Sequence, residues 1–379
     1  MTRTIGIFAC ATALLTGCYE SYFAVPDGDW DVLHPADDGR GDVRDRGGDA
    51  DADVEIEDHT GADADGDADA DADGDADGDV RRDAETGDDA YADGDVWRTR
   101  APMITPRGLL STAALDGKLY AIGGATSEIP AFVGTAVNEV YDPATDTWTE
   151  RAPMPTVRGA VQAVAVGGRI LVLGGWTGGR PELDTVEEYD PATDRWTSRA
   201  PMPTPRSKFT AAVVSGLVYA IGGGDVVSVN EVYDPVADAW STRAPMPTPR
   251  GHMASGVLDG RIYVVGGFPD QATNEVYDPA MDRWESAPPM PNIRAYHGAA
   301  FVGGRLHVLG GSVDSSFLGN RSHQIFDPTT GVWSTGADLP VGRLGVEDGV
   351  EVLDGTLYVV GCSSYDTGGV TGLLHSLTP

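Results

Sequence analysis

Short apolar runs separated by turn residues recur along the chain from residue 96 onward. In the clearest copy, residues 261–284, a run rich in Ile, Tyr and Val ends at the glycine pair Gly266-Gly267. Such a run has the composition of a buried strand, and glycine takes the left-handed backbone angles that end it. A second short run ends at the turn Asp278-Pro279, and Trp284 lies on a further run. With the strand expected upstream of a hairpin turn at Asp259-Gly260, each unit predicts a four-stranded antiparallel meander.

The unit repeats with the spacing of propeller blades. Five copies carry a glycine pair, an aromatic-Asp-Pro turn and a tryptophan, and a sixth copy is altered and divided between the two ends of the repeat region. The glycine pairs begin at Gly123, Gly174, Gly222, Gly266 and Gly310, with Gly361-Cys362 as the altered sixth. The aromatic-Asp-Pro turns begin at Tyr141, Tyr189, Tyr233, Tyr277 and Phe326. The tryptophans are Trp148, Trp196, Trp240, Trp284 and Trp333.

The ends of the repeat region predict how the ring closes. Leu374–Pro379 aligns with the third strand of the unit, and the chain then stops before a fourth strand. An unassigned strand, Val96–Ala101, precedes the first complete unit and carries Trp97. Pairing the two leaves no open sheet edge between the termini. The sequence therefore predicts an all-β, six-bladed propeller over residues 96–379, closed by its N-terminal strand.

In these motifs the chain resembles Kelch-repeat β-propellers over essentially all of residues 96–379. Because the strands of each blade alternate in direction, the a–b and c–d turns, lettered from the innermost strand, share one face. The longer b–c loops and the d–a connections share the other face. They vary most between copies, and function on such scaffolds sits on variable loops held by a rigid frame.

The N-terminal region predicts targeting to the cell envelope and no folded domain. Residues 1–17 read as a signal peptide, with Arg3 before a short apolar stretch. The ending Leu15-Thr16-Gly17-Cys18 resembles a bacterial lipobox, which implies lipid attachment at Cys18 and a lipid-anchored envelope protein with its propeller outside the cytoplasm. An ordinary signal peptide with an incidental cysteine is the alternative. Residues 18–95 read as a disordered, Asp-rich linker.

Most of the negative charge belongs to this linker. The chain has a formal net charge of −33, and residues 19–95 contribute 29 acidic residues against five arginines. The linker lacks the spacing of an EF-hand, so a defined calcium site is not predicted. With Cys10 in the signal peptide and Cys18 acylated, Cys362 is left as a buried, unpaired cysteine in the place of a glycine.

An arginine begins the innermost strand of every blade on the variable-loop face. The resemblance implies that these arginines contact a ligand, because Kelch domains that bind acidic peptides use arginines at matching positions. Guanidinium groups suit carboxylates through bidentate bonds. The alternative is that each arginine pairs with carboxylates or carbonyls of a neighbouring blade. The six are Arg107, Arg158, Arg206, Arg250, Arg294 and Arg343.

Residues beside these arginines differ between blades and add candidates for the same face. Lys208, His252, Tyr296 and His297 follow the arginines of blades three to five. Trp176 and Phe268 follow glycine pairs, where Kelch domains place pocket aromatics. Aromatic faces beside cations suit a sugar or an acidic peptide.

No catalytic set, cofactor or metal site is predicted, since the histidines lack metal-ligand spacing and no G-x-S-x-G elbow is present. Cys362, at a glycine position, does not fit the Tyr-Cys crosslink of a Kelch-type copper-radical oxidase. The predicted function is a binding module for an anionic protein segment or glycan. The alternatives are a sialic acid-type epimerase on the same face, favoured by fold analogy alone, and an architectural surface protein. The acidic charge disfavours nucleic acid.

Overall fold

The computed structural model describes residues 96–127, 133–178, 181–224, 226–269, 271–313, 319–346, 348–364 and 369–379. These residues form twenty-four strands in six four-stranded antiparallel sheets, with no helix among them. No helix in the described part of the chain is therefore long and apolar enough to cross a membrane. The predicted signal peptide, lipidated Cys18 and Asp-rich linker lie outside the described residues.

Each sheet is one blade, given from its innermost to its outermost strand. Blade 1 contains β2 (Ser111–Leu115), β3 (Lys118–Ile122), β4 (Asn138–Asp142) and β5 (Thr147–Glu150). Blade 2 contains β6 (Gln162–Val166), β7 (Arg169–Leu173), β8 (Val186–Asp190) and β9 (Arg195–Ser198). Blade 3 contains β10 (Thr210–Val214), β11 (Leu217–Ile221), β12 (Asn230–Asp234) and β13 (Ala239–Thr242).

The second half of the ring follows the same order. Blade 4 contains β14 (Ala254–Leu258), β15 (Arg261–Val265), β16 (Asn274–Asp278) and β17 (Arg283–Ala287). Blade 5 contains β18 (Gly298–Val302), β19 (Arg305–Leu309), β20 (His323–Asp327) and β21 (Val332–Thr335). Blade 6 contains β22 (Val350–Leu353), β23 (Thr356–Ser364), β24 (Gly369–Leu377) and β1 (Arg98–Arg100).

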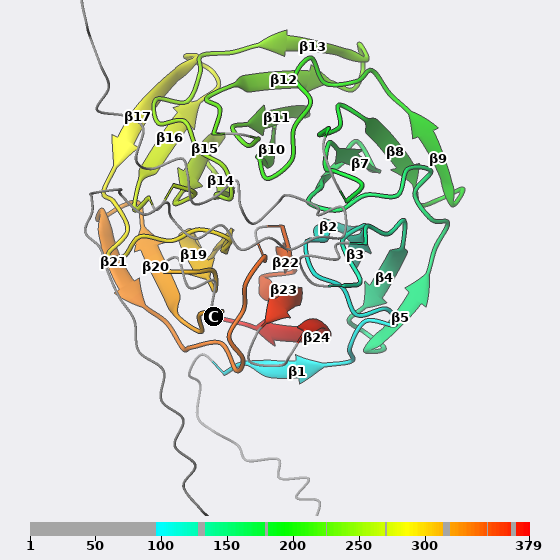
Figure 1. Cartoon of the computed structure of the whole chain (residues 1–379). Helices are drawn as coiled ribbons and strands as arrows, with labels where there is room; N and C mark the ends of the chain where they lie inside the picture. Colours follow the sequence, from blue (N-terminus) through cyan, green and yellow to red (C-terminus); the bar gives the residue numbers. More distant parts are fainter. Residues whose placement is uncertain are drawn as a thin grey trace, which may run out of the picture. The chain divides into compact units, whose positions relative to one another are not determined.

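The sheets close into a ring as the sequence predicts. Consecutive innermost strands contact each other around the centre, and β22 returns to β2 (Figure 1). Strand β1 pairs antiparallel with β24, with Arg98 opposite Ser376 and Arg100 opposite Leu374. The last blade is thus completed by the N-terminal strand, which confirms the predicted all-β, six-bladed propeller.

The recurring tryptophan joins neighbouring blades. Trp148 of blade 1 donates its indole N–H to the carbonyl of Ala101, which directly follows the last strand of blade 6, at 2.8 Å. Asp146 of the same blade accepts hydrogen bonds from the Ala101 N–H and from the Tyr141 hydroxyl. The indole bond recurs in the other five blades, from Trp196, Trp240, Trp284, Trp333 and Trp97 to the carbonyls of Ala152, Ala200, Ala244, Pro288 and Ala337. The tryptophan of each blade therefore ties that blade to its neighbour.

The glycine pairs bring two backbones together. Gly124 has φ of +99°, and a Cβ there would lie 2.7 Å from the carbonyl oxygen of Gly108. Only glycine meets both demands without strain. In blade 6, Cys362 replaces the second glycine and lies 1% exposed beside a register shift in β23. The structure confirms that Cys362 is a buried residue.

Candidate ligand-binding site

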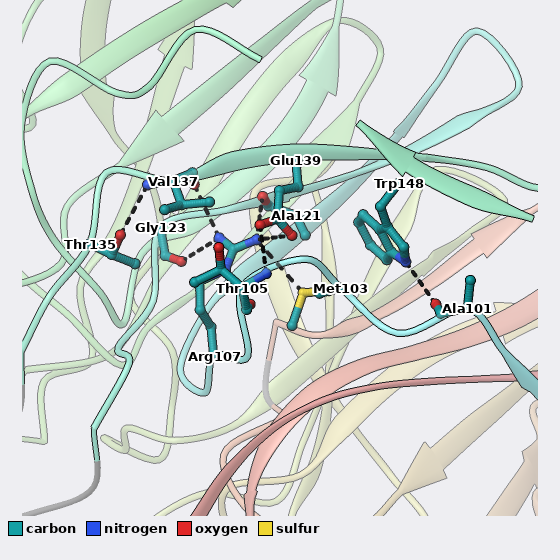
Figure 2. A network of polar contacts seen from close by, with 10 residues as sticks. All are labelled: Ala101, Met103, Thr105, Arg107, Ala121, Gly123, Thr135, Val137, Glu139 and Trp148. Carbon is teal, nitrogen blue, oxygen red and sulfur yellow. Dashed lines mark hydrogen bonds and ion pairs between the residues drawn. The ribbon is translucent and has the colours of Figure 1, made fainter. Parts of the chain in front are cut away.

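The six arginines lie inside the blades, and their guanidinium groups are bonded within the same blade. Figure 2 shows Arg107, whose Nη1 donates to the carbonyls of Gly123 at 2.8 Å and Val137 at 3.1 Å. Its Nη2 donates to Glu139 Oε2 at 3.1 Å and to the Ala121 carbonyl at 3.3 Å. Both side chains of the Arg107–Glu139 pair are 0% exposed.

This arrangement corrects the expected basic ring on the variable-loop face. All six arginine residues are at most 1% exposed: Arg107, Arg158, Arg206, Arg250, Arg294 and Arg343. A buried charge has to be paired and hydrogen-bonded, and the third strand of each of the first four blades supplies a glutamate. Glu187, Glu231 and Glu275 pair with the arginines of blades 2, 3 and 4. The alternative of structural pairing describes them, with the partners in the same blade.

Blades 5 and 6 keep the arginine without the glutamate. Arg294 donates to the carbonyls of Gly310 and Ser322 and to the Ser322 hydroxyl. Gln324 occupies the glutamate position there. Dehydration without a carboxylate lowers the pKa of Arg294 to about 10. In blade 6, Arg343 faces the His375 ring, and burial together with this guanidinium lowers the pKa of His375 to about 4.

His297 is also buried, which corrects its assignment to a ligand-binding face. His297 is 0% exposed and occupies the core position that Phe209 holds in blade 3 and Met253 holds in blade 4. Burial and the nearby charge of Arg294 lower the pKa of His297 to about 3. His297 is therefore a neutral core residue.

The burial of His297 predicts that the free energy of unfolding falls in acid. His297 has a folded-state pKa of about 3, well below the unfolded value, so unfolding takes up a proton. Its contribution to stability is present at neutral pH and is lost as pH falls through the unfolded pKa of about 6.5, at a cost of about 2–3 kcal/mol by about pH 4.5. His297→Met, using the residue of the matching blade 4 position, should reduce the stability difference between those pH values by that amount. Urea unfolding of both chains at each pH measures it, and equal differences would contradict the assignment.

The six innermost strands surround a central channel. Residues with left-handed backbone angles precede these strands at one entrance to the channel. The residue two positions after each arginine has positive φ in all six blades: Leu109, Ala160, Lys208, His252, Tyr296 and Gly345. Backbone bonds link several of these across blades, from the His252 N–H to Lys208 O and from the Tyr296 N–H to His252 O. Non-glycine residues with left-handed backbone angles are strained, and such strained residues are common at functional sites.

Two side-chain pairs from blades 2 to 5 lie at this entrance, Trp176 with Lys208 and His252 with Tyr296, and His252 is 8% exposed. The Lys208 ammonium lies 5.9 Å from the centre of the Trp176 ring, within the range of a cation–π contact. The rings of His252 and Tyr296 have centroids 3.9 Å apart. We call Trp176, Lys208, His252 and Tyr296 the mouth arc. It combines a cation, two aromatic faces and an imidazole.

Two further residues extend the mouth arc. Glu182, in the loop after Trp176, accepts a hydrogen bond from the Ser207 hydroxyl at 2.7 Å. Phe268 is half-buried and pairs through its backbone with Gly251, as Trp176 pairs with Gly159. The structure thus brings the candidates Trp176, His252 and Tyr296 together with Lys208. Glu182 was not predicted, because the sequence does not show that its loop reaches blade 3.

The mouth arc suits a polar ligand that carries an apolar or ring face. Aromatic side chains provide stacking area, and Lys208 provides one positive charge for an anionic group. Among the described residues, no group of three or more histidine, cysteine or acidic side chains could hold a metal ion. The fold and the mouth arc together define a six-bladed β-propeller with a candidate binding site at one end of its channel.

The repeats of this propeller match the model of a known protein family. The Kelch motif matches residues 106–155, 158–203, 205–247 and 249–291. The chain is a Kelch-repeat propeller protein, as its repeats predict.

Similar proteins share part of this chain. It is 36% identical over 88 residues to Kelch repeat and BTB domain-containing protein 12 of Danio rerio, covering 22% of this chain and 14% of that protein. It is 40% identical over 83 residues to the influenza virus NS1A-binding protein homolog of Mus musculus, covering 22% and 12%. The solved structure of YjhT superposes with a TM-score of 0.62 at 16% identity, over 72% of this chain and 95% of that one. The last likeness concerns the fold alone.

Proposed function

We propose that this protein is a lipid-anchored envelope binding module that takes an anionic protein segment or glycan at the mouth arc. The observation that carries the proposal is the chain of contacts from Trp176 through Lys208 to His252 and Tyr296. These residues differ from their counterparts in the other blades. The ring of six arginines that would otherwise supply positive charge is internal.

Lys208 is the residue that gives this site its preference for an anion. The chain has two lysines, Lys118 and Lys208. Lys118 forms an ion pair with Asp142, and Lys208 lies over an aromatic ring at the channel entrance. A carboxylate docking beside Lys208 gains a charge-assisted hydrogen bond.

Different observations favour the two candidate ligands, a protein segment and a glycan. Kelch relatives such as the mouse NS1A-binding protein homolog are named for a protein they bind, which favours a protein segment. The half-buried aromatic face of Trp176 favours a sugar ring equally well. An architectural surface protein would leave the mouth arc without a ligand. Lipid attachment at Cys18 is the anchoring part of the proposal, and a Cys18→Ser variant that still sediments with membranes would contradict it.

A thermal-shift screen of the full-length chain against acidic peptides, acidic glycans and sialic acids tests the binding proposal. A ligand at about 100 times its dissociation constant should add roughly 2.7 kcal/mol of stability. Lys208→Met is expected to remove most of that shift, while Lys118→Met, which deletes the other lysine, should retain it. A ligand that stabilises both variants equally would place its site elsewhere. Conversion of a bound sugar acid, with Glu182 and His252 as the nearby ionisable groups, would instead favour the epimerase.

A further inference from the structure

The innermost strands enclose a cavity of about 340 Å³ along the propeller axis. Its wall is built from β2, β6, β10, β14, β18 and β22, and most of its side chains are small or apolar. Val213, Val257, Phe301 and Val352 give the cavity an apolar stretch. A volume of this size lies within the range of small-molecule sites.

Glu351 places a carboxyl group in this apolar wall. Glu351 of β22 lines the cavity, and its Oε1 accepts a hydrogen bond from the Val352 N–H at 3.0 Å. The side chain retains partial contact with channel solvent but is surrounded by protein atoms. This dehydration raises the pKa of Glu351 to about 7, opposed by the backbone N–H groups of Val352 and Ala114.

The described lining residues offer Glu351 no positive charge. The charged side chains among them are Glu351 and Asp348, both acidic. The strands packed on β22 are β2, β3, β18 and β23. Their ionisable side chains are Lys118, Tyr120, Tyr358 and Cys362, and none of them contributes to the shift of Glu351. A ligand that brings a cation would therefore offset the dehydration of the carboxylate.

We propose that the channel is a second binding site, distinct from the mouth arc, for a linear alkylammonium with its ammonium on Glu351 and its hydrocarbon chain along the apolar wall. The Glu351 carboxylate accepts from the ammonium N–H groups, and the methylene groups bury against Val213, Val257 and Phe301. A straight chain fits because the site is a channel bounded by six strand edges. The proposal does not depend on what the mouth arc binds.

The ionisation of Glu351 sets the pH dependence of this site. The carboxylate form binds an ammonium, and the protonated form lacks the charge that would attract it. With a pKa of about 7, Glu351 is mostly ionised at about pH 8 and about 1% ionised at about pH 5. The apparent affinity should therefore fall by up to about a hundredfold between these values.

The test uses 1-aminobutane and the full-length chain, with melting temperature as the readout. The Asp-rich residues 18–95 will also attract amines, so the measurement is made in about 0.3 M NaCl, where the Debye length is roughly 5–6 Å. Diffuse binding to that segment leaves the propeller's melting temperature unchanged. The controls are Glu351→Gln, which keeps the side-chain shape, and Glu150→Gln, which removes the same charge from the exposed outer strand β5.

The expected result is a saturable rise in melting temperature for the parent chain and for Glu150→Gln at about pH 8. That rise should disappear in Glu351→Gln and, in the parent, at about pH 5. The neutral 1-butanol should produce no rise. Equal shifts in Glu351→Gln and Glu150→Gln, a shift that persists unchanged at about pH 5, or no saturable shift in the parent would each overturn the proposal. Since the pH comparison uses the parent chain, it remains decisive if Glu351→Gln fails to fold.

Discussion

Replacing Arg250 by methionine is expected to destabilise the propeller by about 3–5 kcal/mol, because it leaves the buried carboxylate of Glu275 without its positively charged partner. The guanidinium also donates to the carbonyls of Gly266 at 2.8 Å, Thr248 at 2.9 Å and Val264 at 3.1 Å. These acceptors would lose their donor as well. Burial lowers the pKa of Arg250, and the hydrogen bond and charge of Glu275 oppose that shift. Equilibrium unfolding in urea measures the loss.

Two further variants separate this effect from a general loss of charge. Arg283→Met removes an arginine that is 56% exposed and paired with Glu285, so its effect should be at most about 1 kcal/mol. Arg250→Met combined with Glu275→Gln removes the orphaned charge and should recover part of the stability. If Arg250→Met unfolded at the parental urea concentration yet lost ligand binding, the arginine would be a ligand contact rather than a structural residue.

Deleting Val96–Pro102 is the second change with a large expected effect, a loss of at least about 5 kcal/mol. The deletion removes β1 and its ladder with β24. It removes Trp97, whose indole donates to Ala337 and whose ring lies against His323. It also removes Ala101, which blade 1 holds through Trp148 and Asp146. Both interfaces of the closing strand are lost together, which approaches the whole stability of a typical domain.

The control for this deletion is the removal of residues 70–76 from the Asp-rich segment, seven residues whose loss should leave the melting temperature unchanged. Calorimetric melting of the full-length chain and both deletions compares them directly. A chain lacking Val96–Pro102 that melts at the parental temperature would contradict closure of the ring by β1.

The blade count and ring closure could be predicted because they depend on local signals that repeat. A glycine pair requires positive φ wherever it occurs, and Gly124 shows that requirement. The tryptophans and the Tyr-Asp contacts repeat with the same spacing, so one copy explains the others. The orphan strand at Val96–Ala101 was informative because an incomplete last blade needs a partner.

The role of the arginines was harder to predict, because a repeated polar residue suits either a ring of binding groups or a framework. The sequence did contain a signal that separates the two. Glu139, Glu187, Glu231 and Glu275 recur one residue into the third strand of four blades, in step with the arginines. A charged side chain in a protein core needs an opposite charge beside it. A repeated arginine matched by a repeated glutamate therefore indicates internal pairing.

The mouth arc was predicted in part, because its members are residues that vary between blades. Trp176, His252 and Tyr296 stood out for that reason, and the structure places them with Lys208 at one entrance. His297 is adjacent to Tyr296 in sequence but points into the core. The left-handed angle of Tyr296 makes this change of direction, and no sequence signal marks such an angle at a non-glycine residue.

The most direct test of the account is to locate a bound ligand with the two lysines of the chain. Amine-reactive labelling of the full-length protein, followed by mass spectrometry, measures the reaction rate at Lys118 and Lys208 with and without an acidic ligand from the thermal-shift screen. Binding at the mouth arc predicts that a saturating ligand protects Lys208 and leaves the rate at Lys118 unchanged. Unchanged reactivity of Lys208 under saturation, or protection of Lys118 instead, would contradict binding at the mouth arc.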